Sequence, residues 1–91
     1  FIGDNTTLDC GAGVRLVKSD EGKKFSHVIL NKGALTKTWN KNIVIRNNVF
    51  DTEKRVAILL KDAENVVVGN NMTSHSDYVK VENCQNIEIA D

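Results

Sequence analysis

A short phrase of asparagine and β-branched residues is repeated three times in this chain of 91 residues. It reads Asn-Ile-Val-Ile from Asn42, Asn-Val-Val-Val from Asn65 and Asn-Ile-Glu-Ile from Asn86. The three starting positions are nearly evenly spaced, with a period in the low twenties. Such a period is the length of one structural repeat in a solenoid, so it constrains the fold strongly.

Apolar residues alternate within each phrase. Ile43 and Ile45 share one face of the chain, and the same positions of the later phrases are also apolar. Alternation of β-branched residues with a period of two predicts a strand with one side in a core. The residues predicted to face the core, in two stacked columns, are Ile43, Val66 and Ile87, and Ile45, Val68 and Ile89.

Paired asparagines follow the first two strands, at Asn47-Asn48 and Asn70-Asn71. Asparagine tolerates the left-handed backbone region and can hydrogen-bond to its own backbone, so each pair predicts a sharp bend. Because the bends recur one repeat apart, the side chains of Asn47 and Asn70 are expected to stack as a ladder of amides.

Further strand-like stretches recur with the same period. Ile58 and Leu60 precede Asn65 by the same offsets at which Val79 and Val81 precede the third phrase. A single apolar residue also follows each asparagine bend. Three strands in each repeat of about 22 residues predict an all-β fold, a parallel β-helix solenoid of about three to four coils.

The segments NIVIRNNVF, NVVVGNNM and NIEIAD resemble the repeats of right-handed parallel β-helix proteins of the pectate-lyase-like superfamily. This superfamily includes polysaccharide lyases, polygalacturonases, α-1,3-galactosidases and tailspike-type proteins. The resemblance covers residues 41–91, and the right-handed coil agrees with the rule for parallel crossovers.

The resemblance implies a secreted or cell-envelope carbohydrate-active protein, of glycoside hydrolase or polysaccharide lyase type, in which this stretch mainly supplies scaffold. It implies a polysaccharide or oligosaccharide partner and no cofactor. The alternative is a non-catalytic structural or adhesive surface protein, because such coils also occur in members without activity. Whether the protein is an enzyme stays open, and this segment alone is expected to be inactive.

The first part of the chain is less regular than the second. Residues 41–91 are expected to form regular coils, whereas residues 1–40 are expected to form one or two coils with a loop, in the same single domain. Strand-like stretches at residues 14–17 and 27–30 are separated by a charged turn. Loops that leave one edge of a solenoid are common places for binding surfaces.

Three residues of the first part are candidate contacts for a sugar. Trp39 offers a flat apolar face that suits a pyranose ring, although packing at a coil junction is the alternative. Arg15 and Lys18 faintly resemble the Arg-x-Lys strand with which polygalacturonases hold a sugar carboxylate. Here they are three residues apart, so a strand would turn them to opposite faces, and a solvated edge is the alternative.

No catalytic residue is assigned from the sequence. Hydrolysis of a glycoside by an acid and a base needs two carboxylates about 5–9.5 Å apart. Asp4 with Asp9, and Asp20 with Glu21, are the candidate pairs, but neither lies in an apolar stretch that would shift a pKa. Surface and turn positions are therefore the favoured interpretation of all four.

The sequence predicts neither a metal site nor a disulfide. His27 and His75 have no further ligand at metal-binding spacing. Cys10 and Cys84 lie far apart in the sequence, and free, partly buried thiols are the favoured interpretation.

Charge and hydropathy argue against two other classes of partner. Twelve basic and twelve acidic residues cancel and are scattered, so no basic patch for nucleic acid is expected. The longest apolar run, residues 56–60, is far shorter than the roughly 20 residues that span a bilayer.

The end of a solenoid exposes a sheet edge and an open core unless a cap covers it. The last phrase would leave Ile87 and Ile89 partly uncovered. The sequence therefore predicts that the stretch is a fragment of a longer β-helix, or that further coils or another chain cover this end.

Overall fold

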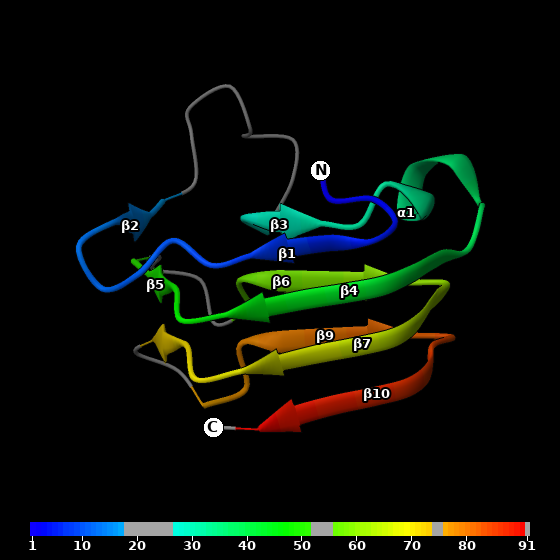
Figure 1. Cartoon of the computed structure of the whole chain (residues 1–91). Coiled ribbons are helices and arrows are strands. Elements are labelled where there is room, and N and C mark those ends of the chain that lie inside the picture. Colours follow the sequence, from blue (N-terminus) through cyan, green and yellow to red (C-terminus); the bar gives the residue numbers. More distant parts are fainter. Residues whose placement is uncertain (18–26, 52–55, 74–75, 91) are drawn as a thin grey trace.

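The computed structural model describes residues 1–17, 27–51, 56–73 and 76–90 (Figure 1). Regular structure in these ranges is almost entirely β-strand, and their one helix, α1 (Gly33–Thr36), is a single turn. The strands are β1 (Thr6–Leu8), β2 (Arg15–Leu16), β3 (Ile29–Leu30), β4 (Asn40–Arg46), β5 (Val49–Phe50), β6 (Ile58–Lys61), β7 (Ala63–Gly69), β8 (Met72–Thr73), β9 (Val79–Glu82) and β10 (Gln85–Ala90). The expectation of an all-β fold is confirmed.

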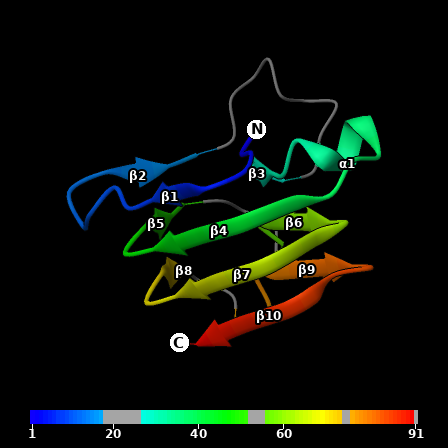
Figure 2. The same cartoon turned by 45° about the vertical axis from the view of Figure 1, so that its right-hand side comes forward.

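The strands form three separate parallel sheets, which the chain visits in rotation. The first sheet has the order β1-β4-β7-β10, the second β2-β5-β8 and the third β3-β6-β9. Figures 1 and 2 show each sheet as a stack, with β1 near one end of the molecule and β10 at the other. This topology is compatible with a parallel β-helix.

Inward residues of the four-stranded sheet lie in register, as the repeat predicts. Val66 pairs with Ile43 on one side and with Ile87 on the other. The second predicted column is in register as well, because Val68 pairs with Ile45 on one side and with Ile89 on the other. Equivalent residues of successive repeats are therefore neighbours in space.

The core lies between the three sheets. Ile58 and Leu60 of β6 and Phe50 of β5 are buried together with the inward residues of β4 and β7. The ring of Phe50 lies beside that of Tyr78, with 6.1 Å between their centroids. Full burial of one large apolar side chain contributes about 1.5–3 kcal/mol, so these contacts hold the sheets together.

Asparagines produce the bends of the chain. Asn47 and Asn70, predicted to turn, both have a φ of 56°. The asparagine that begins each phrase is also left-handed, with φ of 61° at Asn42, 57° at Asn65 and 53° at Asn86. This second set was not predicted, but it follows from the same tolerance of asparagine for the left-handed region.

Residues 1–40 contribute to each sheet, through β1, β2 and β3. Thr6 of β1 pairs with Ile43, and Ile43 pairs with Val66, so the first repeat is much longer than the second. The predicted strands at residues 14–17 and 27–30 correspond to the shorter β2 and β3. The sequence did not predict β1, because Thr6 occupies a position that is apolar in all three phrases.

A buried polar network holds α1 against the stack. The Nδ2 of Asn31 donates to the Oδ1 of Asn40 and to the carbonyl oxygen of Lys61, both at 2.8 Å. The Oδ1 of Asn31 accepts from the backbone N–H of Lys61 at 2.7 Å, and the backbone N–H of Gly33 donates to the Oδ1 of Asn40 at 2.6 Å. Burial of these amides is tolerated because their hydrogen bonds are made inside the protein.

Candidate functional site

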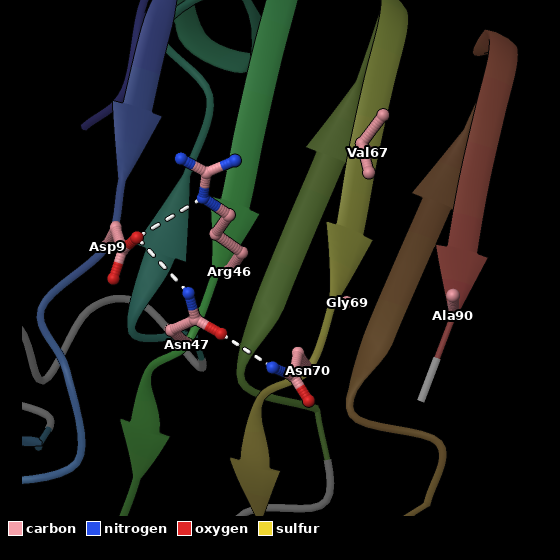
Figure 3. A pocket seen from close by; sticks show the side chains of 7 residues that line it. All are labelled: Asp9, Arg46, Asn47, Val67, Gly69, Asn70 and Ala90. Carbon is pink, nitrogen blue, oxygen red and sulfur yellow. Dashed lines mark hydrogen bonds and ion pairs between the residues drawn. The ribbon is translucent and has the colours of Figure 1, made fainter.

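An open hollow of about 430 Å³ lies on the outer face of the four-stranded sheet (Figure 3). It lies near the carboxyl ends of β4, β7 and β10. The residues that line it are Asp9, Arg46, Asn47, Val67, Gly69, Asn70 and Ala90. Together they offer an ion pair, two amides and an apolar floor.

The shape of the hollow follows from the strand register. Gly69 pairs with Arg46 on one side and with Ala90 on the other, so the three residues form one row across the sheet. Arg46 has a long side chain at one end of this row, whereas Gly69 and Ala90 have almost no side chain. Val67, with 41% of its surface exposed, supplies an apolar surface beside the row.

A chain of hydrogen bonds fixes the polar side of the hollow. The Nε of Arg46 and the Nδ2 of Asn47 both donate to the Oδ2 of Asp9, each at 3.2 Å. The Nδ2 of Asn70 then donates to the Oδ1 of Asn47 at 2.7 Å. This last bond confirms the predicted stacking of the two asparagines, and Figure 3 shows all three bonds.

The guanidinium of Arg46 is held through its Nε. Its two terminal nitrogens point away from Asp9 in Figure 3 and make no hydrogen bond with any described residue. Both side chains of the ion pair are partly exposed, so water screens the pair and it contributes no more than about 1 kcal/mol. The terminal N–H groups of Arg46 therefore remain able to donate to a ligand.

A second, smaller hollow of about 180 Å³ adjoins the first. Asn47 and Asn70 line both hollows, so the amide ladder lies between them. Exposed Met72 adds an apolar surface on this second side. Hydrogen-bonding groups next to small apolar surfaces suit a ligand with both hydroxyl groups and apolar faces.

The predicted sugar contacts lie elsewhere. Trp39 precedes β4 directly and has 39% of its surface exposed. Arg15 lies on β2, where its Nη1 is 3.2 Å from the Oδ2 of Asp51. Because β2 and the start of β4 lie at opposite ends of the sheets in Figure 1, the structure does not bring these two residues together. Lys18 lies outside the described residues, and a binding role for all three stays a prediction.

The candidate acidic residues are hydrogen-bonded at the surface. Asp4 accepts from the Nδ2 of Asn40 at 2.9 Å and from the backbone N–H of Lys41 at 3.0 Å. These two bonds, that of Asn40 first, hold the pKa of Asp4 below its ordinary value of 3.8. An ionised Asp4 does not suit the proton-donating half of a glycosidase pair, which needs a raised pKa. Asp20 and Glu21 lie outside the described residues.

In the described ranges, the cysteines and histidines form neither a disulfide nor a group of metal ligands. Cys10 and Cys84 are free, as expected, and the Sγ of Cys84 donates to the carbonyl oxygen of Leu60 at 3.4 Å. No three His, Cys, Asp or Glu side chains within these ranges are grouped so that they could hold a metal ion. His27 is half-buried, and His75 lies outside the described residues.

Sequence reasoning did not single out the residues of the larger hollow as a binding site. Arg46 and Gly69 occupy the same position of their repeats, directly before the asparagine bend. A long side chain in one repeat and none at the same position of the next was the feature of the sequence that could have indicated the hollow. It has meaning only when the two strands are known to be neighbours.

Comparisons of the chain with protein-family models, with curated proteins and with solved structures found no match. Within the described ranges, no helix is both long enough and apolar enough to cross a membrane. The functional proposal therefore depends on the sheets and on the geometry of the hollow.

Proposed function

We propose that the chain is a segment of a right-handed parallel β-helix of the pectate-lyase-like type, from a secreted or cell-envelope carbohydrate-active protein. The rotation of the chain through three parallel sheets supports this proposal. The regular recurrence of the asparagine-rich phrases supports it as well. In this role the segment is mainly scaffold, and the outer face of its four-stranded sheet provides part of a saccharide-binding surface.

The row of Arg46, Gly69 and Ala90 beside the amide ladder is the observation on which the binding role depends. A sugar ring has hydroxyl groups at its edge and C–H groups on its faces. The amides of Asn47 and Asn70 can bond to hydroxyl groups, while Val67 can contact a ring face. The terminal nitrogens of Arg46, from which no described residue accepts a hydrogen bond, suit the carboxylate of an acidic sugar, because a guanidinium can bind a carboxylate through two parallel hydrogen bonds.

Titration of acidic and neutral oligosaccharides by calorimetry tests the binding role. We expect Arg46→Gln to weaken binding of an acidic oligosaccharide at least about tenfold, because a charge-assisted hydrogen bond contributes about 1.5–3 kcal/mol. Lys80→Gln is the control, since Lys80 is another exposed basic residue paired with a carboxylate, on a different sheet. Equal affinities of the two variants, or a loss confined to Lys80→Gln, would exclude the hollow as the binding site.

A non-catalytic structural or adhesive β-helix is the second candidate. The observation that favours it is the set of asparagine side chains that bond from one strand to the next, which serves the stack itself. A chain that melts cooperatively yet binds no oligosaccharide would support this candidate over the first.

A further inference from the structure

The outer side of β4 carries exposed side chains along its whole length. Asn40 is buried, so the residues on either side of it, Trp39 and Lys41, belong to the opposite, exposed side of the chain. Arg46, at the other end of the strand, is also exposed and lines the larger hollow. At about 3.3 Å per residue, roughly 20 Å separate Trp39 from Arg46. In Figure 1 this is the span of β4 from the side of α1 to the side of β5.

The neighbouring strand β7 continues this surface beside β4. Val44 pairs in register with Val67, and the two valines form an apolar row. Nearer the start of the strands, the Nδ2 of Asn65 donates to the Oδ1 of Asn42 at 3.3 Å. From the start of β4 the surface thus offers an aromatic ring, a cation, two amides, an apolar row and a second cation. Hydrogen-bonding groups that alternate with apolar surfaces suit a chain of sugar units, each of which has hydroxyl groups and C–H faces.

Charges on the sheet favour a direction along β4 for an acidic ligand. The Nζ of Lys41 lies 4.0 Å from the Oε2 of Glu64, and both side chains are partly exposed. Such an ion pair is weak, so the ammonium group can also bind a carboxylate of a ligand. Across the strands the charges are acidic, because Asp9 lies beside Arg46 on the side of β1 and exposed Glu88 lies on β10. Like charges repel, so a ligand with several carboxylates is disfavoured in that direction.

We propose that a linear acidic oligosaccharide binds along the outer side of β4, with one carboxylate at Arg46, another at Lys41 and a sugar ring stacked on Trp39. The flat apolar face of an indole suits such a ring. This inference rests on the proposed function and adds the direction of the ligand, its minimum length and a second contact about 20 Å from the hollow. Short ligands occupy the hollow alone, because they do not reach Trp39.

Trp39 is the only tryptophan of the chain, so its fluorescence reports directly on this contact. The probes are oligogalacturonates of increasing length, from the dimer to the octamer, titrated into the intact chain. We expect the dimer to bind without changing the emission, and longer probes to shift it to shorter wavelengths, because a stacked sugar removes water from the indole. The affinity measured by calorimetry should rise about tenfold at the length at which this shift first appears, and change little beyond it.

Variants of the chain separate the two ends of this surface. Trp39→Ala should bind long probes about tenfold more weakly but the dimer as wild type does, which also shows that the variant is folded. Val14→Ala is its matched control, since Val14 is another exposed apolar residue, next to a different sheet. Lys41→Gln should weaken binding of long probes about threefold, whereas Lys80→Gln, which removes another exposed lysine paired with a glutamate, should not.

The outcomes distinguish this inference from the proposed function. Arg46→Gln should weaken binding of probes of every length. Affinities unchanged by Arg46→Gln, or no binding of any probe at millimolar concentrations, would remove the saccharide site at the hollow and this inference with it.

Other results would overturn the inference alone. If Arg46→Gln weakens binding but Trp39→Ala does not, or weakens binding of the dimer equally, the hollow stands and the direction along β4 is wrong. The same holds if the emission stays unchanged when the longest probe is bound. A loss of affinity in Trp39→Ala that is confined to long probes supports the inference.

Discussion

Asn65 has two separate roles in the stack. Its Nδ2 donates to Asn42, and its Oδ1 accepts from the Nδ2 of Asn86. Its backbone is also left-handed, with a φ of 57°. The first role needs the amide, whereas the second needs only a residue that tolerates this conformation. Glycine and alanine therefore separate the two contributions.

We expect Asn65→Gly to lower the free energy of unfolding by about 1–3 kcal/mol, the net value of two hydrogen bonds, because the ladder is interrupted on both sides. Asn65→Ala should cost about 1–2 kcal/mol more, since alanine is strained in the left-handed region. Urea unfolding of the two variants measures the difference. If alanine were as stable as glycine here, backbone conformation would not be the reason for asparagine at this position.

Asp4 makes stability depend on pH at the acidic end. Its pKa is lowered by the hydrogen bonds from Asn40 and from the backbone of Lys41, so the folded state holds the carboxylate more strongly than the unfolded state does. The resulting stability is fully present above the unfolded pKa of about 4 and is lost as the pH falls through the lower, folded pKa.

We therefore expect wild type to lose more stability than Asp4→Asn between pH 5 and about pH 3, over the range that this lowered pKa defines. Urea unfolding at successive pH values measures the two slopes. Glu88→Gln serves as the control, because Glu88 makes no hydrogen bond or ion pair with a described residue, and it should retain the slope of wild type. Parallel slopes for wild type and Asp4→Asn would contradict the role given to Asp4.

At the scale of elements, the turn from α1 into β4 depends on close backbone packing. A Cβ atom added to Gly33 would overlap the carbonyl oxygen of Thr38 and would lie 2.8 Å from the Oδ1 of Asn40. The same Oδ1 accepts the N–H of Gly33. Both obstacles belong to groups that are already fixed by hydrogen bonds or by the main chain. A side chain at this position must therefore displace the turn.

Gly33→Ala is accordingly expected to destabilise the protein by about 1–3 kcal/mol or more, the usual cost of overpacking. Gly3→Ala is a suitable comparison, because nothing lies within 4 Å of the added Cβ there. Thermal melts followed by circular dichroism compare the two variants. Similar melting temperatures for both would show that the turn rearranges without cost.

The sequence alone predicted the elements that repeat. Columns such as Ile43 with Val66 could be found because a strand that stacks on its own repeat must keep the same apolar pattern. Features that occur once could not be found in this way. The bonds of Asn31 to Asn40 and to Lys61 join parts of the chain that no period relates.

Only part of the candidate site could be predicted from the sequence. Both asparagines of the ladder were identified, because a doubled asparagine after a strand indicates a bend. The row of Arg46 and Gly69 was not, because neither residue is unusual within its own strand. Only the register places a long side chain next to a position without one, and the hollow results from that contrast.

For the molecule as a whole, the cover over the core decreases along the stack. Ile43 in β4 is fully buried, whereas Ile89 in β10 is about half exposed. Every buried polar side-chain atom in the described residues has a hydrogen-bond partner, so unpaired buried polar groups add no further difference in stability between the two ends. Stability should therefore be lowest at the end formed by β10.

We expect Ile43→Ala to cost about 2–5 kcal/mol, as for a fully buried isoleucine, and Ile89→Ala to cost clearly less, because its side chain leaves little additional cavity. Native-state hydrogen exchange should in turn show faster exchange in β10 than in β4 and β7. Uniform protection of all three strands, or equal costs of the two substitutions, would contradict a lower stability of β10.

The unequal spacing of the repeats has a practical consequence. The segment between Thr6 and Ile43 is considerably longer than the segment between Ile43 and Val66, yet both pairs lie in the same register. Additional loop length costs little conformational entropy, since each doubling adds only about 0.6 kcal/mol. The corners between strands are thus natural places for grafting foreign sequences, and the protein could display an engineered epitope there without any change to the strands beneath it.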